Sequence, residues 1–154
     1  MINYSSNLVY GLKTSFDEMC KLTGESDQHE FNYRLGNSLL WILICQERIK
    51  IHNPDDELFL GVKCAANALK HNELLYKLQD YSGPKLPTVV PFALGGTYVW
   101  ASLDHASREI RHQDQISAYR KCLEGKRIDD TLRIVKDKIM EIYEKENLQN
   151  PPQT

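Results

Sequence analysis

The most constraining feature of this sequence is an uninterrupted apolar run at residues 39–45 (LLWILIC). It lies in the middle of a predicted helix over residues 29–51, whose apolar side chains recur at helical spacing on one side and, around the run, on every side. The run is much shorter than the ~20 residues that a membrane-spanning helix needs. A helix that is apolar all round is typical of the centre of a bundle, where neighbours contact several of its faces.

Amphipathic stripes and helix-boundary residues predict the remaining helices. A first helix covers residues 3–23 and ends at Gly24. A third begins at the Asn-Pro-Asp-Asp turn of residues 53–56, where proline and acidic side chains suit a helix start, and runs to about Gln79. A short helix over residues 115–124 ends at Gly125, and a last helix covers residues 129–146.

Prolines and glycines punctuate residues 83–104, where the β-type runs 88–92 and 97–100 predict a small hairpin or an ordered loop. The sequence therefore predicts an all-α fold, an up-and-down bundle of four to five helices with a small β-hairpin or loop insertion. We expect a single helical domain over residues 1–147, with the insertion at about 83–104. Residues 148–154 are expected to form a flexible tail.

Charge and cysteine content narrow the class of function. The 154 residues carry a formal net charge of -2 without an acidic or basic tail, so we expect no DNA partner. The four cysteines show neither C-x-x-C pairs nor zinc-type Cys/His spacing, which favours free thiols in a reducing compartment. We expect a cytoplasmic protein without membrane contact, cofactor or metal. His105, Glu109 and His112 are spaced like metal ligands, but they lie in a polar segment that we interpret as a solvated turn.

The third predicted helix has two apolar faces, so we expect it to be sandwiched. The second face includes Leu60, Cys64, Leu75 and Leu78, and it should meet another helix or another subunit. On this basis we expect a homodimer.

Asn67 and His71 stand one helical turn apart on that second face and could address one site. A histidine there could act as a general acid or base near neutral pH. The pair could equally be a hydrogen-bonded structural pair or part of a dimer interface.

The run over residues 61–71 (GVKCAANALKH) resembles the signature segment of HEPN-like proteins: Arg, a polar residue that is often Asn, three variable residues, then His. Asn67 and His71 match this pattern, and Ala66 occupies the Arg position. The resemblance implies a bundle of four or five helices, frequent homodimers and a bacterial setting in toxin–antitoxin or phage-defence systems. Catalytic members are metal-independent ribonucleases, in which His would handle protons, Arg would stabilise the phosphorane charge and Asn would position the phosphate.

Ala66 offers neither a charge nor a donor to a phosphate, which weakens a nuclease interpretation. Arg34, Arg48 or a residue of a partner subunit could supply the missing cation, whereas we interpret Lys63 as lying off the Asn67 and His71 face. The sequence therefore predicts a non-catalytic or degraded-site HEPN-like protein that binds RNA, an antitoxin-like or other partner protein, or a small ligand in bacterial defence or regulation. The alternatives are a metal-independent endoribonuclease using His71 and a structural interaction protein unrelated to RNA.

Overall fold

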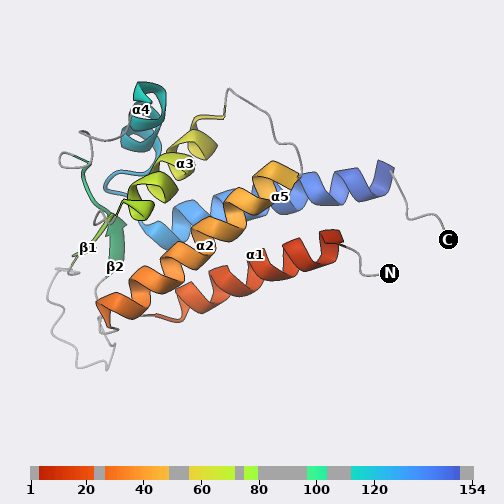
Figure 1. The fold of residues 1–154 in the computed structure, drawn as a ribbon, viewed down its shortest axis with the longest axis horizontal. Helices are drawn as coiled ribbons and strands as arrows, with labels where there is room; N and C mark the ends of the chain where they lie inside the picture. The colour runs from red at the N-terminus through yellow and green to blue at the C-terminus, as the bar shows by residue number, and fades with distance from the viewer. Residues whose placement is uncertain are drawn as a thin grey trace, which may run out of the picture.

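The computed structural model of the chain describes residues 4–22, 27–48, 56–71, 75–79, 97–103 and 112–149. These ranges hold five helices and a two-stranded antiparallel sheet, in the order α1 (Tyr4–Cys20), α2 (Gln28–Arg48), α3 (Glu57–Lys70), β1 (Tyr76–Gln79), β2 (Thr97–Trp100), α4 (Gln113–Cys122) and α5 (Ile128–Gln149). The predicted all-α bundle with a small β insertion is confirmed. Three long helices, α1, α2 and α5, run along the molecule, and α3, α4 and the sheet gather at one end (Figure 1).

Helix α2 is the central element of the bundle, as its apolar run predicts. It contacts α1, α3 and α5, and its core side chains are fully buried: Phe31, Leu35, Leu39, Ile42 and Cys45. Its coverage is nevertheless incomplete, because Leu40, within the apolar run itself, is 52% exposed. None of the helices in the described ranges has the length and apolar character of a membrane span.

Strand β2 is anchored to the helices by two buried aromatic side chains. Trp100 Nε1 donates a 2.7 Å hydrogen bond to Thr131 Oγ1 on α5, and the hydroxyl of Tyr119 on α4 donates to the carbonyl oxygen of Ala101, also at 2.7 Å. Because both aromatic side chains are completely buried, these bonds satisfy polar groups that water cannot reach. They fix the sheet against the α4 and α5 pair.

The third helix is shorter than predicted. Helix α3 begins after Asp56, whose carboxylate accepts a 3.1 Å hydrogen bond from the N–H of Leu58, as the turn at residues 53–56 indicates. It ends at Lys70 instead of near Gln79, because residues 76–79 pair as β1 with residues 97–100. Leu75 is therefore buried outside the helix.

The predicted strand at residues 97–100 is confirmed. It pairs with residues 76–79, which we expected to be helical. In the antiparallel register Tyr76 lies opposite Trp100 and Gln79 opposite Thr97, whereas the run at residues 88–92 lies outside the described residues. A stacked aromatic contact between Phe31 and Tyr98, with ring centroids 3.7 Å apart, supports this pairing from α2. Such a partnership depends on tertiary contacts and leaves no local periodic signal.

The last two helices follow the sequence closely. Gly125 adopts a φ of +74° in the turn between α4 and α5, a conformation that favours glycine. Helix α5 runs to Gln149, three residues beyond the expected end, so the first part of the expected tail is helical. Residues 150–154 lie outside the described part of the chain.

Candidate functional site

Asn67, the first residue of the predicted pair, is a bridge between two helices. It is half-buried on α3, and its Nδ2 donates a 3.3 Å hydrogen bond to Oε1 of the buried Gln115 on α4. A buried amide oxygen without a donor would cost free energy, so this bond stabilises the α3 and α4 pair. The bond gives Asn67 a structural role and uses one of its amide donors within the chain.

His71, the second residue of the pair, lies one residue past the end of α3. It caps the helix through its backbone N–H, which donates to the carbonyl oxygen of Ala68 at 3.0 Å, and its side chain is exposed. The expectation that Asn67 and His71 share an apolar helix face is therefore wrong for His71.

Ala66 occupies the position of the motif arginine, and the proposed substitute Arg34 is engaged in ion pairs. Ala66 is buried, and the guanidinium of Arg34 pairs with the carboxylates of Glu18 at 2.5 Å and Glu30 at 3.6 Å. Arg48 is exposed in the last turn of α2. An ion-paired arginine is less available to a phosphate, so Arg34 is a poor replacement.

Lys63 requires a correction. It precedes Asn67 by four residues on the same continuous helix, and it is exposed, as is Lys70 three residues after Asn67. Residues at this spacing share one side of a helix, so Lys63, Asn67 and Lys70 form a single stripe. The expectation that Lys63 lies off the Asn67 side is wrong.

The second apolar face of α3 is covered within the chain. Cys64 is completely buried, and a Cβ added to Gly61 would lie 3.2 Å from the carbonyl oxygen of Ala118 on α4. Helix α4 therefore packs closely where we expected another helix or a partner subunit. The homodimer prediction loses the surface on which it was based.

The ligand-like spacing of His105, Glu109 and His112, in a segment that we interpret as a solvated turn, lies mostly outside the described residues. His112 is exposed and precedes α4 without a side-chain capping bond. Within the described ranges, no three His, Cys, Asp or Glu side chains come together in a group that could hold a metal ion.

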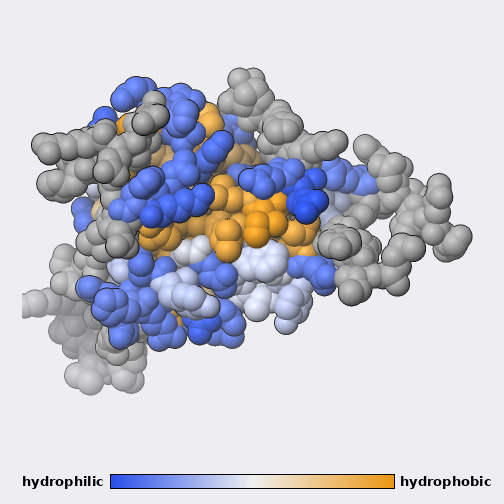
Figure 2. All heavy atoms as spheres, in the orientation of Figure 1, coloured by the Kyte–Doolittle hydropathy of each residue, from blue (hydrophilic) through white to orange (hydrophobic). Residues whose placement is uncertain are grey.

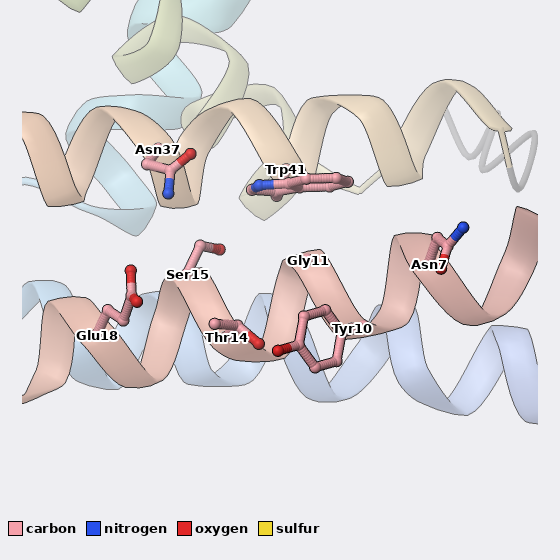
Figure 3. Close-up of a pocket in the computed structure, with 8 residues that line it drawn as sticks. All are labelled: Asn7, Tyr10, Gly11, Thr14, Ser15, Glu18, Asn37 and Trp41. Carbon is pink, nitrogen blue, oxygen red and sulfur yellow. The ribbon is translucent and has the colours of Figure 1, made fainter.

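A second candidate site is a groove of about 340 Å³ between α1 and α2. Eight side chains or backbone positions line it: Asn7, Tyr10, Gly11, Thr14, Ser15, Glu18, Asn37 and Trp41. Figure 3 shows the indole of Trp41 edge-on between the two helices, above Gly11, with Asn37 and Glu18 toward one end and Asn7 toward the other. We call this surface the α1–α2 groove.

Small residues let the two helices that form the groove approach closely. A Cβ on Gly11 would lie 2.5 Å from Cε3 of Trp41, so only glycine leaves room for the indole. One turn further along, Ser38 Oγ on α2 donates a 2.9 Å hydrogen bond to the carbonyl oxygen of Ser15. The floor of the groove is therefore fixed by packing and by a buried hydrogen bond.

Large apolar side chains stand exposed around the groove. Tyr10 on α1 is 71% exposed, Tyr33 and Leu40 on α2 are 68% and 52% exposed, and Ile44 is partly exposed. Figure 2 shows hydrophobic atoms gathered over the middle of the molecule, next to residues of intermediate hydropathy. Contiguous exposed apolar surface of this kind is typical of interaction sites.

The α1–α2 groove is almost free of charge. Glu18 is the single ionisable carboxylate among its lining residues, and it is paired with Arg34. By contrast, α5 carries ion pairs along its exposed surface, including Arg133 with Asp130 and Lys145 with Glu141. Aromatic enrichment with few charges distinguishes the cores of protein interfaces from ordinary surface.

Sequence reasoning did not identify this groove. Its signals were present as the small residues Gly11 and Ser15, one turn apart on the first helix, and as Leu40 and Ile44, on the side of the apolar run opposite its core stripe. A helix that is apolar on every side was expected to be covered by neighbours, and the structure leaves the side with Leu40 and Ile44 open.

Comparisons of this chain with protein-family models, curated proteins and solved structures find no match.

Proposed function

We propose that this chain is a non-catalytic helical binding protein that holds another protein along the α1–α2 groove. The observation that carries this proposal is the concentration of exposed aromatic and aliphatic side chains on the two helices that form the groove. Of the four large hydrophobic side chains with the greatest exposure in the described residues, Tyr10, Tyr33 and Leu40 lie on α1 and α2. Burying such side chains against a partner removes apolar surface from water, which is the main driving force of protein association.

The state of the motif residues supports a non-catalytic role. Ala66 is buried, Asn67 donates to Gln115, and Arg34 is paired with Glu18. Phosphoryl transfer at RNA needs a cation aimed at the developing phosphorane charge. An endoribonuclease that uses the exposed His71 remains the alternative, and it would have to take that cation from elsewhere.

The stripe on α3 favours RNA as a second candidate ligand. Lys63 and Lys70 flank Asn67, both are exposed, and neither forms an ion pair with a described residue. Two lysines supply little of the counterion-release free energy on which RNA binding depends, so we expect weak, strongly salt-dependent binding. For this reason we place a protein partner first.

The resemblance to HEPN-like proteins extends the proposal to a biological setting. On that resemblance, the chain acts in the bacterial cytoplasm in a toxin–antitoxin or phage-defence system, and its partner is an antitoxin-like protein or a second subunit. Each of these is a proposal that rests on Asn67 and His71 alone.

Two measurements test the proposed function. The purified chain should leave single-stranded RNA uncut in the absence of metal; cleavage that His71→Ala abolishes would overturn the non-catalytic assignment. A photo-crosslinking residue at Asn37, in the groove, should form protein adducts that Leu40→Lys removes, whereas one at Asp137 on α5 should not. Equal adducts from both positions would contradict a specific groove partner.

A further inference from the structure

We propose that the end of the α1–α2 groove between Glu18 and Asn37 recognises a carboxamide, the side-chain group of glutamine or asparagine, on the protein that occupies the groove. This inference rests on the proposed function, because it names the chemistry by which the same surface recognises its partner. We call this end of the groove the amide subsite and define it by Glu18, Asn37 and the indole nitrogen of Trp41.

The amide subsite holds polar groups that no described residue satisfies. Neither the side-chain amide of Asn37 nor the indole N–H of Trp41 forms a hydrogen bond within the described part of the chain, and both side chains are half-buried. The other tryptophan shows the usual arrangement of a buried indole, since Trp100 Nε1 donates to Thr131 Oγ1. Trp41 therefore keeps a donor, and Asn37 keeps donors and an acceptor, for a bound group.

These polar groups point into one hollow from both helices. Figure 3 shows the ring nitrogen of Trp41 at the end of the indole nearer Asn37, and the amide nitrogen of Asn37 on the side that faces α1. The carboxylate of Glu18 points from α1 toward α2. Glu18 and Asn37 both line the groove of about 340 Å³ and are not hydrogen-bonded to each other. A group placed between them can therefore contact α1 and α2 at once.

The charges around the subsite favour an uncharged ligand. Glu18 Oε2 accepts from Arg34 Nη1, and Arg34 also pairs with Glu30 at 3.6 Å, outside the groove lining. A carboxylate ligand would meet the carboxylate of Glu18. An ammonium or guanidinium ligand would meet the guanidinium of Arg34 and the indole N–H of Trp41, which can only donate. A neutral group avoids both conflicts.

The hydrogen-bonding pattern of the subsite matches a carboxamide. A primary amide has an oxygen that accepts and an NH₂ group that donates. Its oxygen can accept from the indole N–H of Trp41 and from the amide of Asn37, while its NH₂ group donates to Glu18 Oε1. An apolar side chain in the same place would displace water from these groups without replacing its hydrogen bonds, which costs free energy.

The amide subsite adjoins the apolar surface of the groove. On α2, Leu40 and Ile44 follow Asn37 at three and seven residues, and Tyr33 precedes it by four, so all four residues share one side of the helix. Apolar contacts there supply affinity for a partner. The subsite supplies selectivity, because a site built to hydrogen-bond one group rejects ligands that lack it.

Two-dimensional nitrogen–proton NMR spectra of the full chain test the subsite, because each of the two tryptophans contributes one indole N–H signal. Trp41→Phe assigns the two signals. N-acetylglutamine methylamide should shift the Trp41 signal saturably, with a Kd of about 1–10 mM, as expected for a ligand of this size. The signal of Trp100, which is completely buried and bonded to Thr131, should stay in place. The corresponding glutamate, lysine and methionine compounds should bind at least about fivefold more weakly.

A pair of matched variants tests the role of Asn37. Asn37→Leu should raise the Kd of the glutamine compound about fivefold or more, because leucine keeps a similar volume and removes the amide. Asn32→Leu is the control, since Asn32 is exposed on α2 outside the groove lining, and its Kd should be unchanged. Circular dichroism verifies that both variants are folded. Equal weakening in the two variants would contradict the assignment of Asn37.

The outcomes separate this inference from the proposed function. A Trp41 signal that stays in place at about 0.1 M of the glutamine compound, or that moves equally with all four compounds, overturns the amide subsite. Tighter binding of the lysine compound also overturns it and makes the subsite a cation site. A photo-crosslinking residue at Tyr10 leaves Glu18 and Asn37 in place. If it still gives protein adducts that Leu40→Lys removes, the groove remains a binding site and only the carboxamide is wrong.

Discussion

Gly11 lies directly against the indole of Trp41, so closely that a Cβ on residue 11 would be 2.5 Å from Cε3 of the ring. This contact joins the two helices that form the proposed binding surface, since both residues line the α1–α2 groove. The stability of the helix pair and the shape of the groove therefore depend on the same two residues.

Gly11→Ala should lower the free energy of unfolding by about 1–3 kcal/mol, because the methyl group forces the indole or α1 to shift. Alanine normally favours a helix over glycine by about 1 kcal/mol, so the steric effect has to exceed that gain. The matched control is Gly36→Ala on α2, where the nearest atom is the flexible tip of Leu69 at 3.1 Å. Urea unfolding should show Gly36→Ala to be neutral or stabilised; a stabilised Gly11→Ala would contradict the contact.

Thr131→Val should lower the free energy of unfolding by about 1–3 kcal/mol, because it leaves the buried Trp100 Nε1 without an acceptor. The threonine hydroxyl lies 2.7 Å from that nitrogen, and valine keeps the shape of the side chain. Thr131→Ser retains the hydroxyl and should be less affected. Tryptophan fluorescence during urea unfolding measures both variants, and equal losses would show that the methyl group matters instead of the hydrogen bond.

His71→Ala should lower the free energy of unfolding by less than Asn67→Ala does, because residue 71 is exposed and lies past the last turn of α3. Asn67→Ala should cost more, about 1 kcal/mol, because Gln115 Oε1 is buried and loses its donor. Thermal unfolding of the two variants side by side provides the measurement. A larger loss for His71→Ala would show that its side chain is structural.

The sequence predicts those parts of the fold that depend on neighbouring residues along the chain. Asp56 caps α3, Gly125 turns between α4 and α5, and the apolar run makes α2 central, all from local signals. The strand at residues 76–79 was missed because its partner lies in residues 97–100 and its own periodicity also fits a helix. Tertiary pairing overrides a local preference of this kind.

The candidate site was harder to predict, since it depends on which helix surfaces remain uncovered. The pattern places Asn67 and His71 one turn apart, and it cannot show that α3 ends between them and that α4 covers Cys64. The groove depends on two helices meeting at Gly11 and Trp41, a contact that neither helix encodes alone. Contacts between helices therefore determine both the surroundings of Asn67 and His71 and the shape of the groove.

Alkaline pH should destabilise the fold through its buried acids. Burial raises the pKa of the Cys45 thiol to about 11 from 9.0, and burial also raises the pKa of the Tyr119 phenol above its usual 10.0. The unfolded chain therefore releases these protons first, so the free energy of unfolding is unaffected below pH 9 and falls as the pH rises toward 11. Thermal unfolding between pH 8 and pH 11 should show this decrease, and Cys45→Ala should reduce its slope; an unchanged slope in the variant would exclude the Cys45 thiol as a cause.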